Sequence, residues 1–323
     1  MKTQNTDSEA NNNKTNRAVF IGVDISKDEL VADLPEGLRT KKRDVKGIAE
    51  LIDRLPVNAH VICEATGGYE KSLVKALHQA GKKVSVVMAW RARAYAISQG
   101  IMAKNDSIDA SVLSRYGRNT EKLRETRPSA PAVERLRELM RARDALIELI
   151  KLETNHREHA GDIEMLATHA SQRIATYQEQ KKQLEKAIRE HIKQDAQMSQ
   201  RAERCLQIKG VGEVMVWTLL CELPELGTME KGQPAHLLGV APLCKQSGKH
   251  DGLRYIQGGR GRPRRVFYMA ALSAAQHNPI LRAFYERLVA RGKARKVALV
   301  AVMRKLVELI NKILAEPDFS LAT

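Results

Sequence analysis

The chain has 323 residues, and 43% of them are hydrophobic, which is enough to bury a sizeable core in two or three structural units. Its 54 Lys and Arg residues against 38 Asp and Glu residues give a net charge of +16, which favours a polyanionic partner, although a ribosomal or membrane-surface protein carries the same kind of excess. No apolar run reaches the roughly 18 residues that span a membrane, and aromatic residues, at 4%, argue mildly against a dedicated single-strand binder.

The N-terminal residues and the cysteines indicate the cellular location of the protein. Residues 1–17 are rich in Asn, Thr and Lys and lack the apolar segment of a signal peptide, so we expect a disordered tail on a cytoplasmic protein. The chain has no CxxC pair, which predicts reduced thiols and neither a zinc site nor a disulfide framework. These thiols are Cys63, Cys205, Cys221 and Cys244.

The first third of the chain alternates short β-branched runs with amphipathic segments. Pro35-Glu36-Gly37 separates two of the expected strands, so the first three strands predict an antiparallel meander. The order β-β-β-α-β-α-β predicts an α/β domain with a mixed sheet flanked by helices, for which the RNase H-like fold is one solution. The expected strands are residues 18–25, 28–34, 37–45, 59–65 and 82–89, and the expected helices are 46–55, 69–80 and 106–118.

The rest of the chain is expected to be mainly helical. Residues 132–193 have almost no Gly or Pro and carry apolar residues at heptad-like spacing, which predicts a helical hairpin that breaks near Gly161 and acts as a spacer or as a dimerising arm. From Arg201 onwards, 20 Lys and Arg stand against 10 Asp and Glu, which indicates nucleic-acid binding. We therefore expect a tail (1–17), a catalytic α/β domain (18–127), a helical linker (128–200) and a C-terminal domain (201–323).

Four acidic residues are candidates for a metal site. Asp24 ends the first expected strand, Glu64 ends the fourth, and Asp106 and Asp109 lie three residues apart on one face of a helix. Hard cations such as Mg²⁺ or Mn²⁺ take oxygen ligands, and clustered carboxylates would repel one another without one. Taken alone, each acid is more typical of a structural turn, cap or helix-terminal residue than of a catalytic one; their joint placement favours a metal centre.

Two glycine-containing segments are candidates for nucleic-acid contacts. Lys209-Gly210-Val211-Gly212 precedes an apolar helix, a pattern typical of a helix-hairpin-helix turn that offers N–H groups to a phosphate, or of a plain tight turn. Residues 245–265 hold seven Lys and Arg, one Asp and five Gly, as expected of a flexible cationic loop. The proposed contacts are Lys209, Gly210, Gly212, Lys245, Lys249, Arg254, Arg260, Arg262, Arg264 and Arg265.

Three sequence blocks around the acids resemble a known family. GVDISKDEL around Asp24, CEATGGYE around Glu64 and KNDSIDA around Asp106 and Asp109 are similar to the blocks of the DEDD class of insertion-sequence transposases, which includes the Piv-type invertases and the bridge-RNA-guided recombinases. In that family the four acids hold divalent metal in a RuvC-like domain. Asn105 departs from the threonine usual there and leaves both acids in place.

The resemblance extends to the C-terminal region and implies a mechanism. The block Gln246-Ser247-Gly248 matches one whose serine is implicated as a nucleophile on DNA, so Ser247 is the candidate that attacks the scissile phosphate; what activates it is open, with His250, Lys249 and the metal as options. The resemblance implies double-stranded DNA as substrate, a prokaryotic, nucleoid-associated location, a dimer or tetramer, and for some members a structured guide RNA. Two other functions stay open: a resolvase-type endonuclease that needs no serine, and a non-catalytic nucleic-acid binder.

Overall fold

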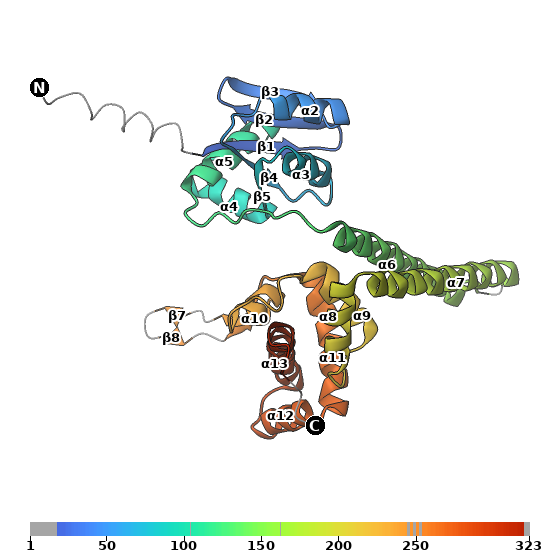
Figure 1. The fold of residues 1–323 in the computed structure, drawn as a ribbon. Helices are drawn as coiled ribbons and strands as arrows, with labels where there is room; N and C mark the ends of the chain where they lie inside the picture. Colours follow the sequence, from blue (N-terminus) through green and yellow to red (C-terminus); the bar gives the residue numbers. More distant parts are fainter. Residues whose placement is uncertain are drawn as a thin grey trace, which may run out of the picture. The chain divides into compact units, whose positions relative to one another are not determined.

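The computed structural model describes residues 18–319 with gaps at 104, 162, 244–245, 248–249 and 252–253, and for residues 246, 247, 250 and 251 it describes the backbone only. The chain forms two compact units, the first ending at Pro128 and the second beginning at Ser129 (Figure 1).

The first unit contains the five-stranded mixed sheet that the sequence predicts. Its strands are β1 (Val19–Ile25), β2 (Glu29–Leu34), β3 (Gly37–Lys42), β4 (Ala59–Glu64) and β5 (Lys83–Val87), in the order β3-β2-β1-β4-β5. β1, β2 and β3 pair antiparallel, which confirms the meander, and β4 and β5 run parallel to β1. The carboxyl ends of β1, β4 and β5 therefore meet at one edge of the sheet.

Helices cover both faces of this sheet, and strand residues alternate between them. The helices are α2 (Val45–Asp53), α3 (Glu70–Gln79), α4 (Ala89–Ser98) and α5 (Asp106–Asn119). Val23 of β1 and Cys63 of β4 pack in one cluster with residues of α2 and α3. Ile62 of β4 packs in another cluster with residues of α4 and α5. Even-numbered residues of β1 and β4 thus face α4 and α5.

Helix α4 is an element that the sequence analysis did not predict. Its buried side chains are Ala92 and Ala96, which are too small to register as an apolar stripe, while its larger apolar residues Trp90 and Ile97 are exposed. Apolar periodicity therefore points away from the face that this helix buries.

The second unit begins with the predicted helical hairpin, which is confirmed. It consists of α6 (Pro131–Glu158) and α7 (Glu164–Gln194), with Gly161 at a φ of +58° between them (Figure 1). Charged pairs cross the seam: Arg143 donates to Glu185, and Arg173 donates to Glu153, each at 2.8 Å. Arg143 and Glu153 are both buried.

The remaining helices of this unit pack around one apolar core. They are α8 (Ala196–Leu206), α9 (Glu213–Glu222), α10 (Gln233–Leu238), α11 (Gly261–His277), α12 (Pro279–Ala290) and α13 (Arg295–Ala315). Residues 215–221 of α9 are buried without interruption, as expected of a central helix. The core also takes Phe267 of α11 and Leu306 and Ile310 of α13.

Between α10 and α11 the chain forms two short antiparallel ladders. β6 (Pro242–Leu243) pairs with β9 (Tyr255–Ile256), and β7 (Gln246–Ser247) pairs with β8 (His250–Asp251). The expectation that residues up to 265 belong to a loop is wrong, because α11 already begins at Gly261. Pro263 is compatible with this start, since the first turn of a helix does not need its N–H.

The described helices include none with the length and apolar character needed to cross a membrane. The described cysteines are free and buried, and burial raises the pKa of Cys63 to about 12 and those of Cys205 and Cys221 to about 11. Cys244 lies outside the described residues.

Candidate functional site

Two of the four candidate acids lie at the same edge of the sheet and on the same face. Val23 and Cys63 are partners on the parallel strands β1 and β4, and Asp24 and Glu64 are the residues that follow them. Neighbouring strands are about 4.8 Å apart, so the Cα atoms of the two acids are separated by about 5 Å. Both residues are even-numbered and half-buried, and both therefore face α4 and α5.

Helix α5 lies directly on β1 because residue 22 is glycine. The N–H of Gly22 donates to Oγ of Ser114 at 2.7 Å, and a Cβ on Gly22 would lie 1.9 Å from the carbonyl oxygen of Ala110. At the other end of the contact, a Cβ on Gly117 would lie within 3 Å of Ile62 and Phe20. The helix therefore runs antiparallel to β1, and its N-terminus points to the edge that carries Asp24.

This direction brings the other two acids to the same edge. From Gly22 to Asp24 a strand advances about 7 Å, which equals about four residues of helix. Four residues before Ala110 is the first turn of α5, where Asp106 is exposed and Asp109 is half-buried. Asn105 caps this turn, since its side chain accepts the N–H of Ile108 at 2.8 Å. A threonine can cap a helix in the same way, so Asn105 preserves the local structure.

The fit of this edge to a divalent cation rests on the backbone and on the donor set. Asp24, Glu64, Asp106 and Asp109 supply only carboxylate oxygens, which suit Mg²⁺ or Mn²⁺. Among the residues that the structure describes, no three His, Cys, Asp or Glu side chains converge as a ready-made ligand group. The fold thus brings the acids to one edge, while their side chains do not form a closed ligand shell.

The loop after Glu64 is fixed by a carboxylate that the sequence analysis missed. Glu70 accepts hydrogen bonds from the N–H and Oγ1 of Thr66, at 3.1 and 3.0 Å, and from the N–H of Gly68 at 2.8 Å. Burial raises the pKa of Glu70, but these backbone and hydroxyl donors outweigh it and leave the pKa lowered. The signal was present in TGGYE: Gly67 and Gly68 have positive φ, and the acid follows directly after the turn.

The predicted Gly-Val-Gly turn joins α8 to α9. Gly210 has a φ of +99°, and a Cβ there would lie 2.5 Å from Cα of Ala274, so close packing against α11 accounts for this glycine. Gly212 is the N-cap of α9 and has open space around it, and Lys209 is exposed. Contact of this turn with DNA stays a prediction.

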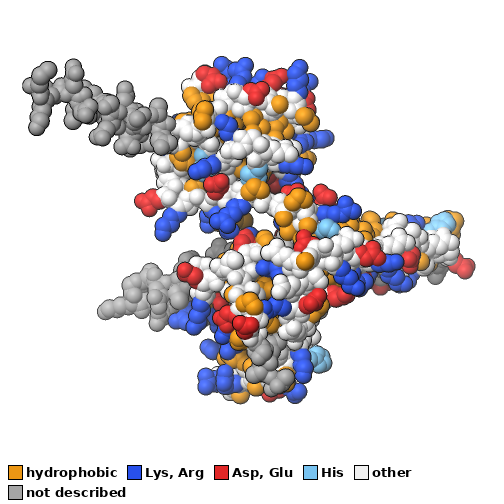
Figure 2. Space-filling view, viewed as in Figure 1, with side chains coloured by type: hydrophobic (Ala, Val, Ile, Leu, Met, Phe, Trp, Pro, Cys, Tyr) orange, Lys and Arg blue, Asp and Glu red, His pale blue; other side chains and the backbone are white. Residues whose placement is uncertain are grey.

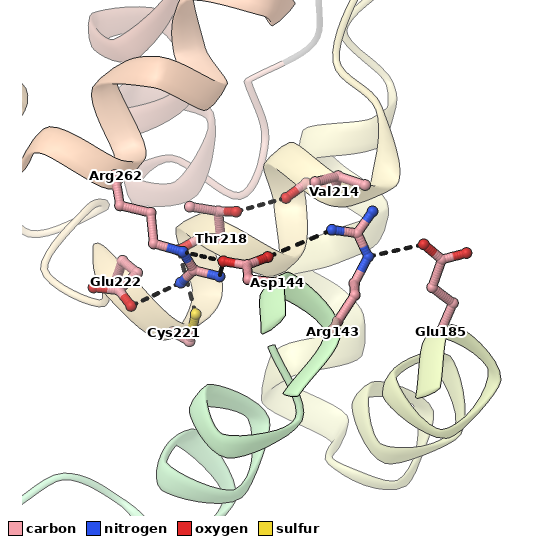
Figure 3. Close-up of polar contacts among 8 residues, drawn as sticks. All are labelled: Arg143, Asp144, Glu185, Val214, Thr218, Cys221, Glu222 and Arg262. Atoms are coloured by element: carbon pink, nitrogen blue, oxygen red, sulfur yellow. Dashed lines mark hydrogen bonds and ion pairs between the residues drawn. The ribbon is translucent and has the colours of Figure 1, made fainter. Parts of the chain in front are cut away.

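Three of the arginines proposed to bind nucleic acid make contacts within the second unit. Arg262 pairs with Asp144 of α6 at 2.7 Å and with Glu222 of α9 at 2.9 Å (Figure 3). Burial lowers the pKa of Arg262, but Asp144 and Glu222 outweigh it and raise the pKa. Arg260 pairs with Glu225 at 2.6 Å, and Arg264 donates to the carbonyl oxygen of Gly258 at 2.8 Å.

Of the other proposed nucleic-acid contacts, some are exposed and some lie outside the described residues. Arg254 and Arg265 are exposed, like Lys209, and are available to a ligand. Ser247 lies in β7 opposite His250 of β8, but its side chain is outside the described part of the chain. Lys245 and Lys249 also lie outside the described residues.

Comparison with known proteins adds family evidence to this geometry. A family model described as "Transposase" matches residues 21–157, and a model described as "Transposase IS116/IS110/IS902 family" matches residues 202–286. The chain belongs to this transposase family. The first match contains all four acids, and the second contains the Gly-Val-Gly turn, Ser247 and the arginines of α11.

This transposase is also similar to curated proteins. It is 28% identical over 256 residues to a pilin gene-inverting protein of Moraxella lacunata, covering 77% of this chain and 78% of that protein. A pilin gene-inverting protein of Moraxella bovis matches with the same identity and coverage. Family and relatives together assign the chain to the DNA transposases and recombinases.

Proposed function

We propose that this transposase cleaves and rejoins DNA strands at a divalent-cation site made by Asp24, Glu64, Asp106 and Asp109, with Ser247 as the nucleophile. The observation that carries the proposal is the meeting of two parallel strand ends and the first turn of α5 at one edge and on one face of the sheet. A metal bound there would stabilise the negative charge that develops on the phosphate oxygens during strand exchange.

The chain's own residues have separate roles in this proposal. The four carboxylates hold the cation. The hydroxyl of Ser247 forms a bond to phosphorus, the bond from phosphorus to one strand end breaks, and the hydroxyl proton ends on the released oxygen. The number of phosphodiester-type bonds is unchanged, so rejoining needs no external energy source. The support for Ser247 is the family resemblance of the block around it.

The proposed partners are DNA, further copies of the chain and a guide RNA. DNA would contact Lys209, Arg254 and Arg265, which are exposed, together with the N–H groups around Gly210 and Gly212. The gene-inverting relatives support inversion of a DNA segment as one outcome. A dimer or tetramer, and a guide RNA, stay predictions that rest on the family resemblance alone.

The acids are tested by Asp24→Asn and Glu64→Gln in a cleavage assay on DNA carrying the ends of the mobile element. We expect each change to lower the rate in Mg²⁺ or Mn²⁺ by about 1,000-fold or more, because several kcal/mol of charge stabilisation are lost. Glu36→Gln is the matched control, since Glu36 lies in the β2–β3 turn at the opposite edge of the sheet. Full activity of Asp24→Asn would exclude the proposed site.

Ser247→Ala separates the recombinase from a resolvase-type endonuclease. In a recombinase that uses Ser247, the variant forms no covalent protein–DNA product and transfers no strands, although it still binds DNA. The product is measured by denaturing gel electrophoresis with labelled DNA. Undiminished strand transfer by this variant would remove the serine from the mechanism and leave the carboxylate site unaffected.

A further inference from the structure

One of the two tryptophans of the chain is exposed near the carboxylate edge. Trp217 is buried, at 3% exposure, whereas Trp90 is 61% exposed. Trp90 is the second residue of α4, which begins just after β5 ends at Val87. Val87 is the strand partner of Glu64. Trp90 therefore lies at the same edge of the sheet as the acids, on the helix that shares their face with α5.

A second exposed ring lies beyond the neighbouring strand. Tyr69 follows the Thr66–Gly68 loop after β4 and is 42% exposed. Glu70 holds this loop through its three hydrogen bonds, so Tyr69 is presented on a fixed turn. Tyr69 thus comes from the loop that follows β4, which ends at Glu64, and Trp90 from the helix that begins just after β5, whose last residue pairs with Glu64.

Each ring has an arginine beside it. The guanidinium of Arg43 lies 4.8 Å from the centre of the Tyr69 ring, and that of Arg91 lies 5.5 Å from the centre of the Trp90 ring. Arg43 is held in place by a bond from its Nε to the carbonyl oxygen of Lys27, in the turn after β1. The ends of β1, β3, β4 and β5 therefore combine exposed aromatic side chains with positive charge.

This combination selects one kind of ligand. An apolar protein partner would gain from the rings but would bury the guanidinium groups of Arg43 and Arg91 at a cost. A nucleic-acid strand uses both, because its bases stack on aromatic rings and its phosphates pair with arginine. A base can present its face only when it is unpaired or at a strand end. The overall scarcity of aromatic residues is consistent with a local platform and not with a long single-strand channel.

We propose that Trp90 and Tyr69 stack on unpaired nucleotides of a DNA strand and hold it beside the carboxylate edge. This inference rests on the proposed function, since it places the bound strand where Asp24 and Glu64 act on a phosphate. The rings bind the strand and do not take part in the chemistry. Their role is specific to a separated strand, while the basic residues of the C-terminal region bind the backbone of a duplex.

The test uses the intrinsic fluorescence of the full-length chain, titrated with a short oligodeoxythymidine and with the matching duplex. Stacking quenches the emission of Trp90, and the Trp90→Phe variant gives the baseline of the buried Trp217. We expect Trp90→Leu and Tyr69→Leu each to weaken binding of the single strand by about 5- to 100-fold, with a smaller effect on the duplex. Trp90→Phe should keep most of the affinity, because phenylalanine also stacks.

Val57→Ala is the control, because Val57 is 96% exposed before β4, at the opposite edge of the sheet. The proposal is overturned by an unchanged emission of Trp90 on saturation with the oligonucleotide. It is equally overturned by a Trp90→Leu variant that binds both DNAs normally but loses self-association in sedimentation, which would make this face a protein interface.

The Asp24→Asn variant distinguishes failure of this inference from failure of the proposed function. If the acids cleave and the rings bind, this variant keeps both the quenching and the affinity while it loses cleavage. If it cleaves normally and still shows quenching, the carboxylate site is wrong and the stacking surface stands. If Asp24→Asn loses cleavage but the unsubstituted chain shows no quenching, the carboxylate site stands and the stacking surface is wrong.

Discussion

At the scale of single residues, Gly22 determines how closely α5 approaches the sheet. The backbone of Ala110 occupies the space where a Cβ on residue 22 would lie, and Ser114 bonds to the N–H of the same glycine. Two of the acids are close in sequence to these contacting residues, since Asp24 is two residues after Gly22 and Asp109 is one residue before Ala110. Packing at Gly22 therefore sets how closely the helix that carries Asp106 and Asp109 approaches the strand that carries Asp24.

Gly22→Ala is expected to destabilise the first unit by about 3 kcal/mol or more, since the obstructing atoms are backbone and cannot move aside as a side chain can. Urea unfolding followed by circular dichroism measures the change. Gly261→Ala is the matched control, because a Cβ there meets open space at the start of α11 and should leave stability unchanged or slightly raised. Equal stability of the two variants would contradict the close contact.

At the scale of elements, the GRGRPRR segment divides into three arginines that make contacts within the fold, Arg260, Arg262 and Arg264, and one that faces solvent, Arg265. Arg262 joins α11 to α6 and α9 through Asp144 and Glu222 (Figure 3). Arg265, one turn along the same helix, is exposed. Both positions are arginines in the first turns of α11, so only the packing of α6 and α9 against Arg262 distinguishes them.

The two positions should respond differently to alanine. Arg262→Ala leaves Glu222 without its ion-pair partner and leaves Asp144 with Arg143 alone, at 3.6 Å, and we expect a loss of about 2 kcal/mol in unfolding free energy. Arg265→Ala should leave stability unchanged and lower DNA affinity, with a salt dependence reduced by about one phosphate contact. Chemical denaturation and fluorescence anisotropy measure the two effects. If Arg262→Ala instead kept its stability and lost DNA affinity, Arg262 would belong to the DNA interface.

The sequence predicts an element well when its apolar residues recur with the period of a helix or a strand. The meander, the parallel strands and the helix bearing Asp106 and Asp109 follow from apolar periodicity, and the hairpin from its composition. Helix α4 is missed because it buries alanines, and the start of α11 is missed because Gly261 and Pro263 are typical of loops. The acids are predictable at their strand ends, whereas the bracing role of Glu70 depends on a loop conformation that periodicity does not report.

At the scale of the whole molecule, the positive charge and the candidate acids belong to different parts of the chain. The region from Arg201 carries +10 of the net +16, while all four acids precede residue 110. On the face drawn in Figure 2, Lys and Arg side chains are spread over both units and are mixed with Asp and Glu along the hairpin. Much of the charge along the hairpin is therefore balanced locally, and the net excess of the C-terminal region is separate in sequence from the candidate acids.

We therefore expect DNA affinity to be strongly dependent on salt and independent of the acids. For about six phosphate contacts, raising salt from about 50 to about 200 mM should weaken binding about 1,000-fold. Asp24→Asn should show the same slope, measured by fluorescence anisotropy over a series of salt concentrations. A flat salt response would contradict a phosphate-based interface, and a changed slope in the variant would contradict the separation.

The charged pairs across the α6–α7 seam also decide which alignment the two helices can adopt. Sliding α7 by four residues would set Arg143 against Arg189 in one direction and against Lys181 in the other, instead of against Glu185. The same slips would set Glu153 against Tyr177 or His169 in place of Arg173. Either slip would bring like charges together at Arg143 and would remove the arginine partner of Glu153. The charged pairs therefore favour the observed register over these two alternatives, in addition to the effect of apolar packing.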